Sequence, residues 1–280
     1  MRIARHVGGG FILGTSQGGW VSTGALGVRA TVLADLIEHL PVLAESAASA
    51  TPDVHNPHLA APVGRPGKIL AVGLNYLQHI AELGRPRPST PMIFAKYPSA
   101  VTGPTDPIEL NPSVTAEVDY EAELAVVIGW PARNVDATHA AEHILGYCVG
   151  NDVSARDLQR AEPQISRSKS LDTFCPIGPW ITTADEVSDP QSLRITTTVN
   201  GVTRQDSTTA DLLFGVPELV AHLSRTMTLE PGDVILTGTP SGVGSGMTPP
   251  TYLNEGDIVR CEIEKLGRIE NRVVSPAANR

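Results

Sequence analysis

The residues with the clearest chemical potential are two glutamates at the start of a long apolar run. Residues 119–129 predict a β-strand, in which Glu121 and Glu123 point to the same face. The run beyond them is apolar on both faces, so this strand is expected to be buried. A buried carboxylate without a partner normally loses its charge, pairs with a cation or binds a metal. A strand end open to solvent is the alternative interpretation.

A third carboxylate stands at the end of another apolar stretch. The strand predicted ahead of Asp152 carries Gly146 and Gly150 on one face, so that a neighbouring layer can approach closely. Carboxylate oxygens with no cysteine or histidine cluster beside them suit Mg²⁺, Mn²⁺ or Ca²⁺ better than zinc. The sequence thus predicts a site for a hard divalent cation at Glu121, Glu123 and Asp152.

A histidine and a glutamate form a second candidate group. If residues 75–84 are helical, His79 and Glu82 lie three positions apart on one face. A carboxylate that orients an imidazole raises its basicity, as the activation of water requires. The proline-containing loop at 85–90 could form a mobile lid together with this helix. An ordinary surface pair is the alternative.

The segment after Asp152 predicts a place for an anionic group. Ser154 and Asp157 match a capping-box pattern, so a helix should begin here with Arg156 and Gln159 on one face of its first turns. Helix starts attract anions, and a guanidinium binds a carboxylate through two hydrogen bonds. A pocket for a substrate carboxylate is therefore expected beside the cation site.

Two more polar side chains stand in irregular segments. Lys169 adjoins an apolar stretch and could stabilise a developing oxyanion, although a solvated lysine is equally compatible with the pattern. Thr239 lies at the start of a glycine-rich loop that lacks the Gly-Lys-Ser/Thr ending of a phosphate-binding loop. The loop amides and Thr239 could still contact an anionic substrate.

Composition limits the partners and the compartment. The net charge of −9 and the absence of a basic run argue against nucleic acid and anionic membranes as partners. The three cysteines are scattered and include no Cys-x-x-Cys pair, which is typical of free thiols in a reducing compartment. No signal peptide or membrane-spanning segment is evident. We therefore expect a cytoplasmic protein that acts on a small molecule.

The elements that must position these residues are mostly strands. Glycine-broken apolar runs near the N-terminus predict small strands, and a helix fits residues 31–40, with Pro41 ending or kinking it. Residues 50–68 have the composition of an extended proline-rich linker. We expect residues 1–65 to form a small N-terminal accessory domain and linker, and residues 66–280 to form the main domain.

The second half of the chain contains clear signals for a turn, a helix and paired strands. Asn200 and Gly201 form the dipeptide most typical of a tight β-hairpin, and a helix is expected at about 217–224. The strands near the C-terminus, within 257–274, should pair with each other. The fold class predicted is mainly β with short helices (α+β).

Five motifs, taken in order, closely resemble the fumarylacetoacetate hydrolase family, whose metal-dependent members include acylpyruvate hydrolases and related decarboxylases and isomerases. They span about residues 68–274. The motifs are Gly-Leu-Asn-Tyr-x-x-His-x-x-Glu at 73–82, Tyr-Glu-x-Glu at 120–123, Asn-Asp-Val-Ser-Ala-Arg-Asp at 151–157, Lys-Ser at 169–170, and Leu-Thr-Gly-Thr-Pro-x-Gly-Val-Gly at 236–244.

The resemblance implies a layered β-roll of the family's C-terminal type that forms a homodimer. It implies Mg²⁺ or Mn²⁺ at Glu121, Glu123 and Asp152, and a water-activating pair of His79 and Glu82 on a lid. The residues that it places against substrate are Arg156, Gln159, Lys169 and Thr239.

One position departs from the founding members of the family. They carry an additional metal-binding aspartate upstream of the histidine, where this sequence has Val72. The chain therefore looks like the shorter acylpyruvate and sugar-acid branch, and fumarylacetoacetate itself is not the expected substrate.

The expected reaction is hydrolysis of a carbon–carbon bond in an acylpyruvate or another 2,4-dioxo acid, of the retro-Claisen type. The metal would chelate the 2-oxo carboxylate, and water activated by His79 would attack the carbonyl two carbons further along. The same site would also serve decarboxylation or tautomerisation (isomerisation) of a 2-oxo acid, or lyase chemistry on a sugar acid. A non-catalytic 2-oxo-acid binding protein is the alternative outside the enzymes.

Overall fold

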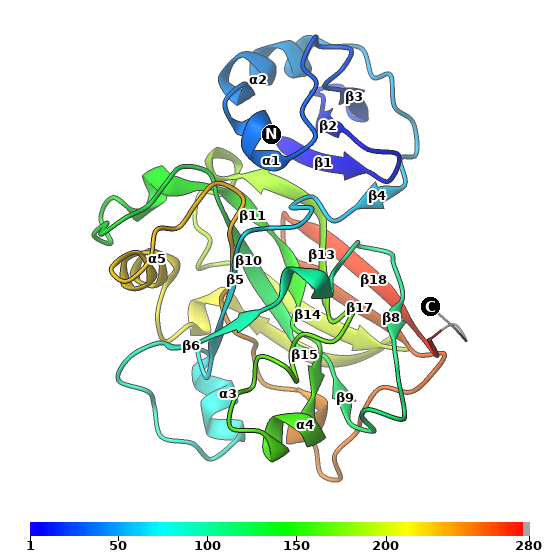
Figure 1. Ribbon diagram of the computed structural model, residues 1–280, viewed down its shortest axis with the longest axis vertical. Coiled ribbons are helices and arrows are strands. Elements are labelled where there is room, and N and C mark those ends of the chain that lie inside the picture. The colour runs from blue at the N-terminus through cyan, green and yellow to red at the C-terminus, as the bar shows by residue number, and fades with distance from the viewer. Residues whose placement is uncertain (277–280) are drawn as a thin grey trace.

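The computed structural model describes residues 1–276, in which strands dominate and the helices are short (Figure 1). The strands are β1 (Arg2–His6), β2 (Phe11–Gly14), β3 (Trp20–Ser22), β4 (Leu59–Ala60), β5 (Ile69–Gly73), β6 (Met92–Lys96), β7 (Val101–Thr102), β8 (Ile108–Glu109), β9 (Val118–Asp119), β10 (Ala122–Ile128), β11 (Ile144–Asn151), β12 (Ser154–Ala155), β13 (Cys175–Thr183), β14 (Arg194–Val199), β15 (Val202–Thr208), β16 (Val234–Leu236), β17 (Ile258–Ile263) and β18 (Gly267–Val274). The α-helices are α1 (Leu33–Ile37), α2 (Leu40–Ser49), α3 (Leu77–Glu82), α4 (Arg156–Ala161) and α5 (Val216–Ser224). Short 3₁₀ turns are η1 (Pro98–Ala100), η2 (Ala140–His143), η3 (Ala184–Glu186), η4 (Thr209–Asp211) and η5 (Gly244–Gly246).

Two sheets form the body of the molecule. The larger one has 11 strands in the order β3-β2-β1-β13-β11-β10-β16-β5-β6, with β4 added at β1 and β7 at β13. The smaller one has five strands in the order β15-β14-β17-β18-β8, and β12 pairs separately with β9. Most neighbours are antiparallel, as short connections favour. The predicted fold class, mainly β with short helices, is confirmed.

Strand β10 lies near the middle of the larger sheet and is buried on both faces. Leu124 and Val126 belong to the apolar core shared with the five-stranded sheet. Ala125 and Val127, on the other face, belong to a second core that includes residues of α1 and α2. The sequence therefore reads as an almost continuous apolar run, as expected for a strand between two layers.

Strand β11 uses its glycines for close packing. A Cβ atom at Gly146 would lie 2.2 Å from the carbonyl oxygen of Thr182, and one at Gly150 would lie 2.7 Å from Cδ2 of Leu236. Real Cβ atoms do not come this close, so neighbouring strands occupy the space that a side chain would need. These contacts come from β13 and β16 of the same sheet, whereas the sequence predicted the close approach of a neighbouring layer.

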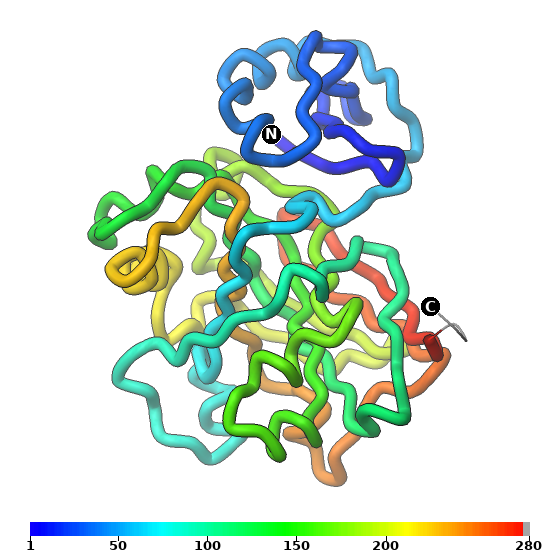
Figure 2. Tube along the Cα trace, viewed as in Figure 1, coloured from blue at the N-terminus to red at the C-terminus, as the bar shows by residue number. Residues whose placement is uncertain are grey.

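The N-terminal segment joins the larger sheet. Strand β1 pairs with β13 through Arg2 and Ile3, and β4, within the predicted linker, pairs with β1. Figure 2 follows the blue N-terminal trace across the top of the view and into the cyan strand β5 of the body. The boundary near residue 65 stays a prediction, and the pairing of β1 with β13 crosses it.

Three local predictions differ from the structure. The single helix expected at 31–40 is replaced by the two helices α1 and α2. Pro41 lies in the first turn of α2, where backbone N–H groups make no intrahelical hydrogen bond, so a proline costs none. The strand expected at 119–129 is interrupted, because β9 ends at Asp119 and β10 begins at Ala122. Ser154 is not a helix cap: it lies in β12, and its hydroxyl donates to the carbonyl oxygen of Asp152.

The later elements follow the sequence pattern. Asn200 and Gly201 both have positive φ angles, 52° and 78°, and join β14 to β15 as a tight hairpin. Helix α5 begins with Pro217 in its first turn. Within the described part of the chain, no helix is long and apolar enough to cross a membrane.

Candidate metal centre and active site

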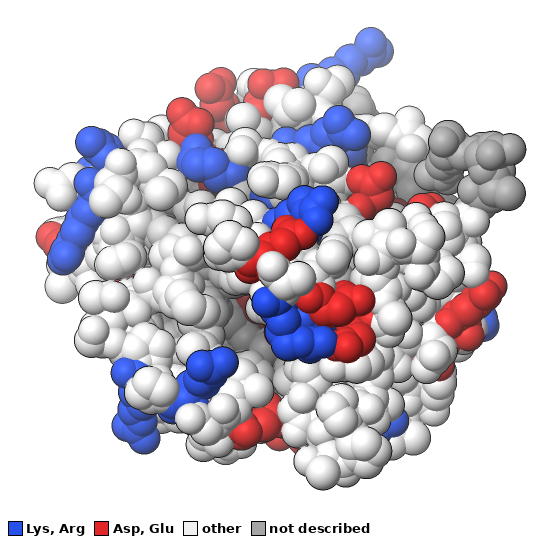
Figure 3. Space-filling view, turned by 60° about the horizontal axis from the view of Figure 1, so that its bottom comes forward, with Lys and Arg blue, Asp and Glu red and all other residues white. Residues whose placement is uncertain are grey.

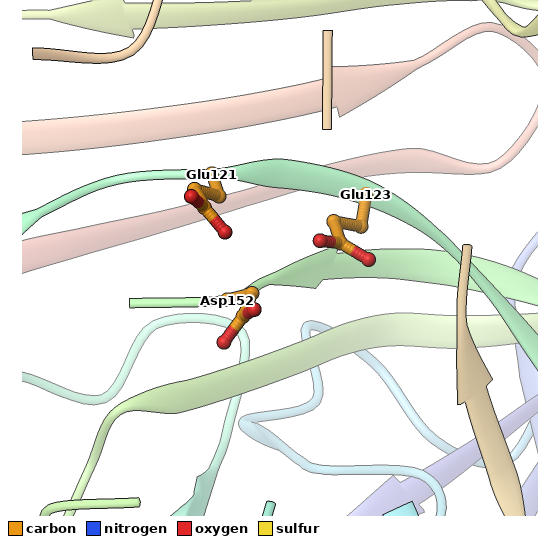
Figure 4. A group of neighbouring side chains, drawn as sticks. All are labelled: Glu121, Glu123 and Asp152. Carbon is orange, nitrogen blue, oxygen red and sulfur yellow. The ribbon is translucent and has the colours of Figure 1, made fainter. Parts of the chain in front are cut away.

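The three predicted carboxylates meet at one point. Glu121, Glu123 and Asp152 are buried, and one oxygen of each lies within 4.8 Å of the others. The pairing of Ala122 with Asn151 places the start of β10 beside the end of β11, and the amide of Asp152 donates to the carbonyl oxygen of Glu121. Figure 4 shows the three side chains close together where these two strands meet, with Glu121 and Glu123 on the side of Asp152.

Two cations sit directly against Glu121. The Nζ atom of Lys169 donates to Oε2 of Glu121 at 2.6 Å and to Oδ2 of Asp152 at 2.7 Å. Nη2 of Arg156 donates to Oε1 of Glu121 at 2.6 Å. Burial raises the pKa of Glu121, but the positive charges of Arg156 and Lys169 outweigh that effect and hold it at about 2. Glu121 therefore carries a negative charge at neutral pH.

Glu123 lacks such a cation. Its Oε2 accepts a hydrogen bond from the amide of Gly238 at 2.7 Å, and no salt bridge to it is found within residues 1–276. Burial, together with the negative charges of Asp152 and Glu121, raises the pKa of Glu123 well above its usual range. A divalent cation would supply the positive charge that this carboxylate needs. Three buried hard-oxygen donors, one of them uncompensated, therefore fit a divalent metal.

Lys96 is a part of this centre that the sequence analysis did not assign. Its Nζ donates to Oδ1 of Asp152 at 2.5 Å, to the carbonyl oxygen of Val153 at 3.3 Å and to the carbonyl oxygen of Lys169. An ammonium has three N–H groups, so all of them are used. Lys96 thus joins the chain segments that carry Asp152 and Lys169. The available signal in the sequence was a lysine at the end of the short, mostly apolar stretch that forms β6.

Arg156 is held by several partners. Its Nε donates to Oδ2 of Asp119 at 2.9 Å and its Nη1 donates to Oε1 of Gln159 at 3.0 Å, in addition to the bond with Glu121. These bonds use three of the five donors of a guanidinium, which leaves two for a ligand. The bidentate contact with a substrate carboxylate stays a prediction.

Asp119 is a further residue that the sequence analysis left without a role. Besides the guanidinium of Arg156, it accepts hydrogen bonds from the amides of Gly244, at 2.7 Å, and Ser245, at 3.0 Å. It therefore connects the start of α4 to the glycine-rich loop. Nothing in its local sequence distinguishes it from any other acidic residue at a strand end.

His79 and Glu82 form a direct pair on α3. Nδ1 of His79 lies 2.8 Å from Oε2 of Glu82, and His79 is only 6% exposed. The other oxygen of Glu82 accepts from the amide of Gly242 at 2.8 Å, which docks α3 onto the glycine-rich loop. The surface-pair interpretation does not describe a histidine this buried.

A cavity of about 860 Å³ connects the predicted site residues. Figure 3 shows the corresponding face, which is hollowed near its centre, with basic side chains on opposite sides of the hollow. Glu82 and Asp152 are not on the cavity wall but bond to residues that are, namely His79 and Lys169. The predicted residues on the wall are His79, Glu121, Glu123, Arg156, Gln159, Lys169 and Thr239.

Comparison with known proteins places this geometry in a family. Residues 68–274 match the family model described as fumarylacetoacetate (FAA) hydrolase C-terminal. The chain belongs to the fumarylacetoacetate hydrolase family. The resemblance inferred from the five motifs is thereby confirmed.

Three relatives in the fumarylacetoacetate hydrolase family indicate the range of activities nearby. The oxaloacetate tautomerase fahd2, mitochondrial, of Xenopus laevis is 48% identical over 221 residues, which are 78% of this chain and 69% of that protein. A putative HpcE protein from Mycobacterium smegmatis has a crystal structure that superposes with a TM-score of 0.90 at 39% identity, covering 98% of this chain and 99% of that one. A maleylpyruvate hydrolase from Sphingobium sp. SYK-6, solved with manganese(II) and pyruvate, superposes with a TM-score of 0.81 at 34% identity, covering 98% and 99%.

Family membership supports the interpretation that the chain is an enzyme whose substrate is a small 2-oxo acid. Relatives bear the names of a tautomerase and of a hydrolase, and the hydrolase was solved with a divalent metal. The buried carboxylate cluster of this chain is consistent with such a metal. One of these relatives is named as mitochondrial, so the cytoplasmic compartment stays a prediction.

Proposed function

We propose that the protein is a metal-dependent hydrolase that cleaves a carbon–carbon bond in an acylpyruvate or a related 2,4-dioxo acid. The observation that supports this most is the contact of the buried His79 with Glu82, because the imidazole lines the same cavity as Glu121 and Glu123. Hydrolysis needs a base for water as well as a metal site. The proposed base, His79, and two of the proposed metal ligands, Glu121 and Glu123, line the same cavity.

The metal site would be formed by Glu121, Glu123 and Asp152, with Mg²⁺ or Mn²⁺ as the expected ion and Ca²⁺ as a further candidate. When bound, the ion would act as a Lewis acid toward the oxygens of a 2-oxo carboxylate. The manganese and pyruvate named for the Sphingobium hydrolase support this choice of metal and ligand class.

His79 would take the proton from water. A carboxylate only accepts hydrogen bonds, so the short contact with Glu82 places the imidazole proton on Nδ1. In the neutral imidazole, Nε2 then carries no proton and would act as the base, and the Glu82 carboxylate would stabilise the positive charge that the ring acquires. The bond from Gly242 to Glu82 fixes the direction of this pair.

The bond changes balance without a further reactant. Water deprotonated by His79 would add to the carbonyl at carbon 4, two carbons beyond the 2-oxo group, and the bond between carbon 4 and carbon 3 would break. The electron pair stays on the pyruvate fragment, which takes back the proton, so the products are a carboxylic acid and pyruvate. Lys169 would stabilise negative charge that develops on oxygen, while substrate binding falls to Arg156, Gln159 and Thr239.

Oxaloacetate tautomerisation is a second candidate, favoured by the 48% identity to a protein named as an oxaloacetate tautomerase. His79 would move a proton between carbon 3 and the 2-oxo oxygen, and no carbon–carbon bond would break. The same residues would bind this smaller dicarboxylate. The two candidates differ in whether water is consumed.

One experiment separates the candidates. The Mg²⁺- or Mn²⁺-loaded protein is incubated with a series of acylpyruvates and, separately, with the enol form of oxaloacetate, and products are followed by NMR and ultraviolet absorbance. Hydrolysis is supported by equal amounts of pyruvate and carboxylic acid, with ¹⁸O from labelled water in the acid. Rapid loss of the enol signal without acylpyruvate cleavage would replace hydrolysis by tautomerisation as the main activity. Turnover of neither compound would return the chain to a non-catalytic binding role.

A further inference from the structure

Gln205 lies outside the motifs that define the site, yet it reaches the site from the other sheet. It belongs to β15 of the five-stranded sheet and is fully buried. Its Oε1 accepts from the amide of Ala122 at 3.1 Å and from Oγ1 of Thr197 at 2.7 Å. Its Nε2 donates to the carbonyl oxygen of Pro240 and to Oγ1 of Thr239, both at 2.8 Å.

The orientation of the Gln205 side-chain amide is determined by two backbone partners, one of which can only donate a hydrogen bond and the other only accept one. A backbone N–H can only donate and a carbonyl oxygen can only accept. The bond with Ala122 therefore requires the oxygen of Gln205 on one side, and the bond with Pro240 requires its nitrogen on the other. The amide makes all four hydrogen bonds that it can form.

This saturation fixes the role of the Thr239 hydroxyl. Both hydrogens of Nε2 are committed, so the bond to Thr239 is donated by Gln205 and accepted by Oγ1. The hydroxyl proton is then left for another acceptor, and none takes it among residues 1–276. Thr239 is 5% exposed and lines the cavity that Glu123 and Lys169 also line, so an acceptor on a bound ligand can receive that proton.

We propose that Gln205 is a positioning residue that turns the Thr239 hydroxyl into an obligatory hydrogen-bond donor toward the substrate. The ligand group that it selects is a hydrogen-bond acceptor, a carboxylate or 2-oxo oxygen, and not a hydroxyl or amine that must donate. The inference rests on the proposed function only for the identity of that ligand, a 2-oxo carboxylate. It also assigns the five-stranded sheet a part in substrate binding.

The first test reverses the direction of the hydrogen bond between residue 205 and the Thr239 hydroxyl. Gln205→Glu has nearly the same shape, but a carboxylate has no N–H, so the Thr239 hydroxyl would donate to it and withdraw its proton from the cavity. We expect the dissociation constant of pyruvate for the Mn²⁺-loaded protein, measured by calorimetry, to rise about tenfold or more. Thr239→Val should produce a similar rise. The exposed Thr203→Val on the same strand is a matched control and should leave pyruvate binding unchanged.

The decisive measurement is the double variant. If Gln205 acts through Thr239, Gln205→Glu should weaken pyruvate binding no further in the Thr239→Val background. Equal effects in both backgrounds, or a loss of Mn²⁺ affinity in Gln205→Glu, would show a general structural role and overturn the proposal.

The test remains valid if the Gln205→Glu variant does not fold, and also if the proposed hydrolysis is not observed. Should Gln205→Glu fail to fold, pyruvate binding by Thr239→Val remains decisive, because wild-type affinity there would remove the proposed donor. Thr239→Ser, which retains a hydroxyl, should bind pyruvate more tightly than Thr239→Val. Since pyruvate binding needs no turnover, the absence of acylpyruvate cleavage would contradict the proposed function and leave this test standing.

Discussion

At the scale of single residues, Glu123 is the carboxylate whose charge depends most on a bound metal. Glu123→Gln keeps the shape and the acceptor for Gly238 but removes the negative charge. We expect the affinity for Mg²⁺ or Mn²⁺, measured by calorimetry, to fall by about tenfold or more, since ligand charge dominates binding of hard cations. Activity of the wild type should vanish in chelator and return with added metal.

A surface glutamate provides the matched control for this change. Glu230 is exposed and lies at a turn outside the carboxylate cluster, so Glu230→Gln should bind metal as the wild type does. Undiminished metal affinity in Glu123→Gln, or full activity in exhaustive chelator, would contradict the assignment of the metal centre.

Lys96 offers a prediction about stability as well as metal binding. Lys96→Met removes a fully buried cation and leaves Oδ1 of Asp152 and two carbonyl oxygens without their donor. Losing one partner of a buried pair costs about 3–5 kcal/mol, so the thermal unfolding midpoint of the metal-free protein should fall by several degrees. Calorimetry should also show weaker metal binding, because Asp152 is no longer held.

The comparison for Lys96 is another lysine that pairs with a buried aspartate. Lys68→Met removes the partner of Asp233, which lies outside the carboxylate cluster, and should lower the unfolding midpoint without changing metal affinity. Unchanged metal binding in both variants would restrict Lys96 to a purely structural role.

The His79–Glu82 pair yields a prediction that separates two chemistries. His79→Ala and Glu82→Ala should each slow acylpyruvate hydrolysis by about 10²-fold or more, the usual scale of general-base catalysis, with metal affinity intact. Decarboxylation of oxaloacetate needs chiefly a sink for electrons, so it should suffer much less. Both rates are measured on the same metal-loaded variants, and hydrolysis near the wild-type rate would place the base elsewhere.

At the scale of elements, the contact between α3 and the glycine-rich loop determines where His79 sits. Gly242 has a φ of +99°, donates to Glu82, and would place a Cβ 2.0 Å from the carbonyl oxygen of Arg204. Gly242→Ala should therefore displace the loop, loosen α3 and lower kcat/KM, with faster amide exchange in α3 as the direct readout. Gly232→Ala is the control, because Gly232 has a similar φ of +88° but open space around its Cβ position.

The strands also show which structural features can be predicted from local sequence patterns. Alternation over the predicted strand at 119–129 was enough to place Glu121 and Glu123 on one face, although β10 begins only at Ala122. The glycine spacing of β11 was enough to predict close contacts, but not that strands of the same sheet make them. Both are local properties with a fixed period. The interruption before Ala122 was not predictable, because it depends on β9 leaving the sheet to pair with β12.

Positions that depend on distant partners were the ones missed. Lys96 and Asp152 are 56 residues apart in the chain, and Gln205 and Thr239 are 34 apart on different elements. A buried lysine or glutamine has the same local sequence appearance as a solvated one, and only the packed structure shows which acceptors surround it. The five family motifs located the catalytic candidates, whereas the residues that orient them lie mostly between the motifs.

At the scale of the whole molecule, the N-terminal segment and the body share structure. Strand β1 extends the sheet at β13, and Leu36 of α1 packs in the same apolar core as Leu145 and Leu236 of the body. A small accessory unit without this shared core would unfold on its own. The shared sheet and core instead favour joint unfolding of the full chain.

This prediction is tested by differential scanning calorimetry of the full chain. We expect a single transition, which Leu36→Ala should shift to lower temperature as a whole, since truncating a buried leucine costs about 2–5 kcal/mol. Val42→Ala, at an exposed position of α2, is the matched control and should leave the transition in place. Two separate transitions, with only the first one shifted by Leu36→Ala, would instead support the independent N-terminal domain predicted from the proline-rich sequence at 50–68. In that case the hydrogen bonds between β1 and β13 would contribute little to the stability of the body, and a chain that begins at residue 66 should retain metal binding.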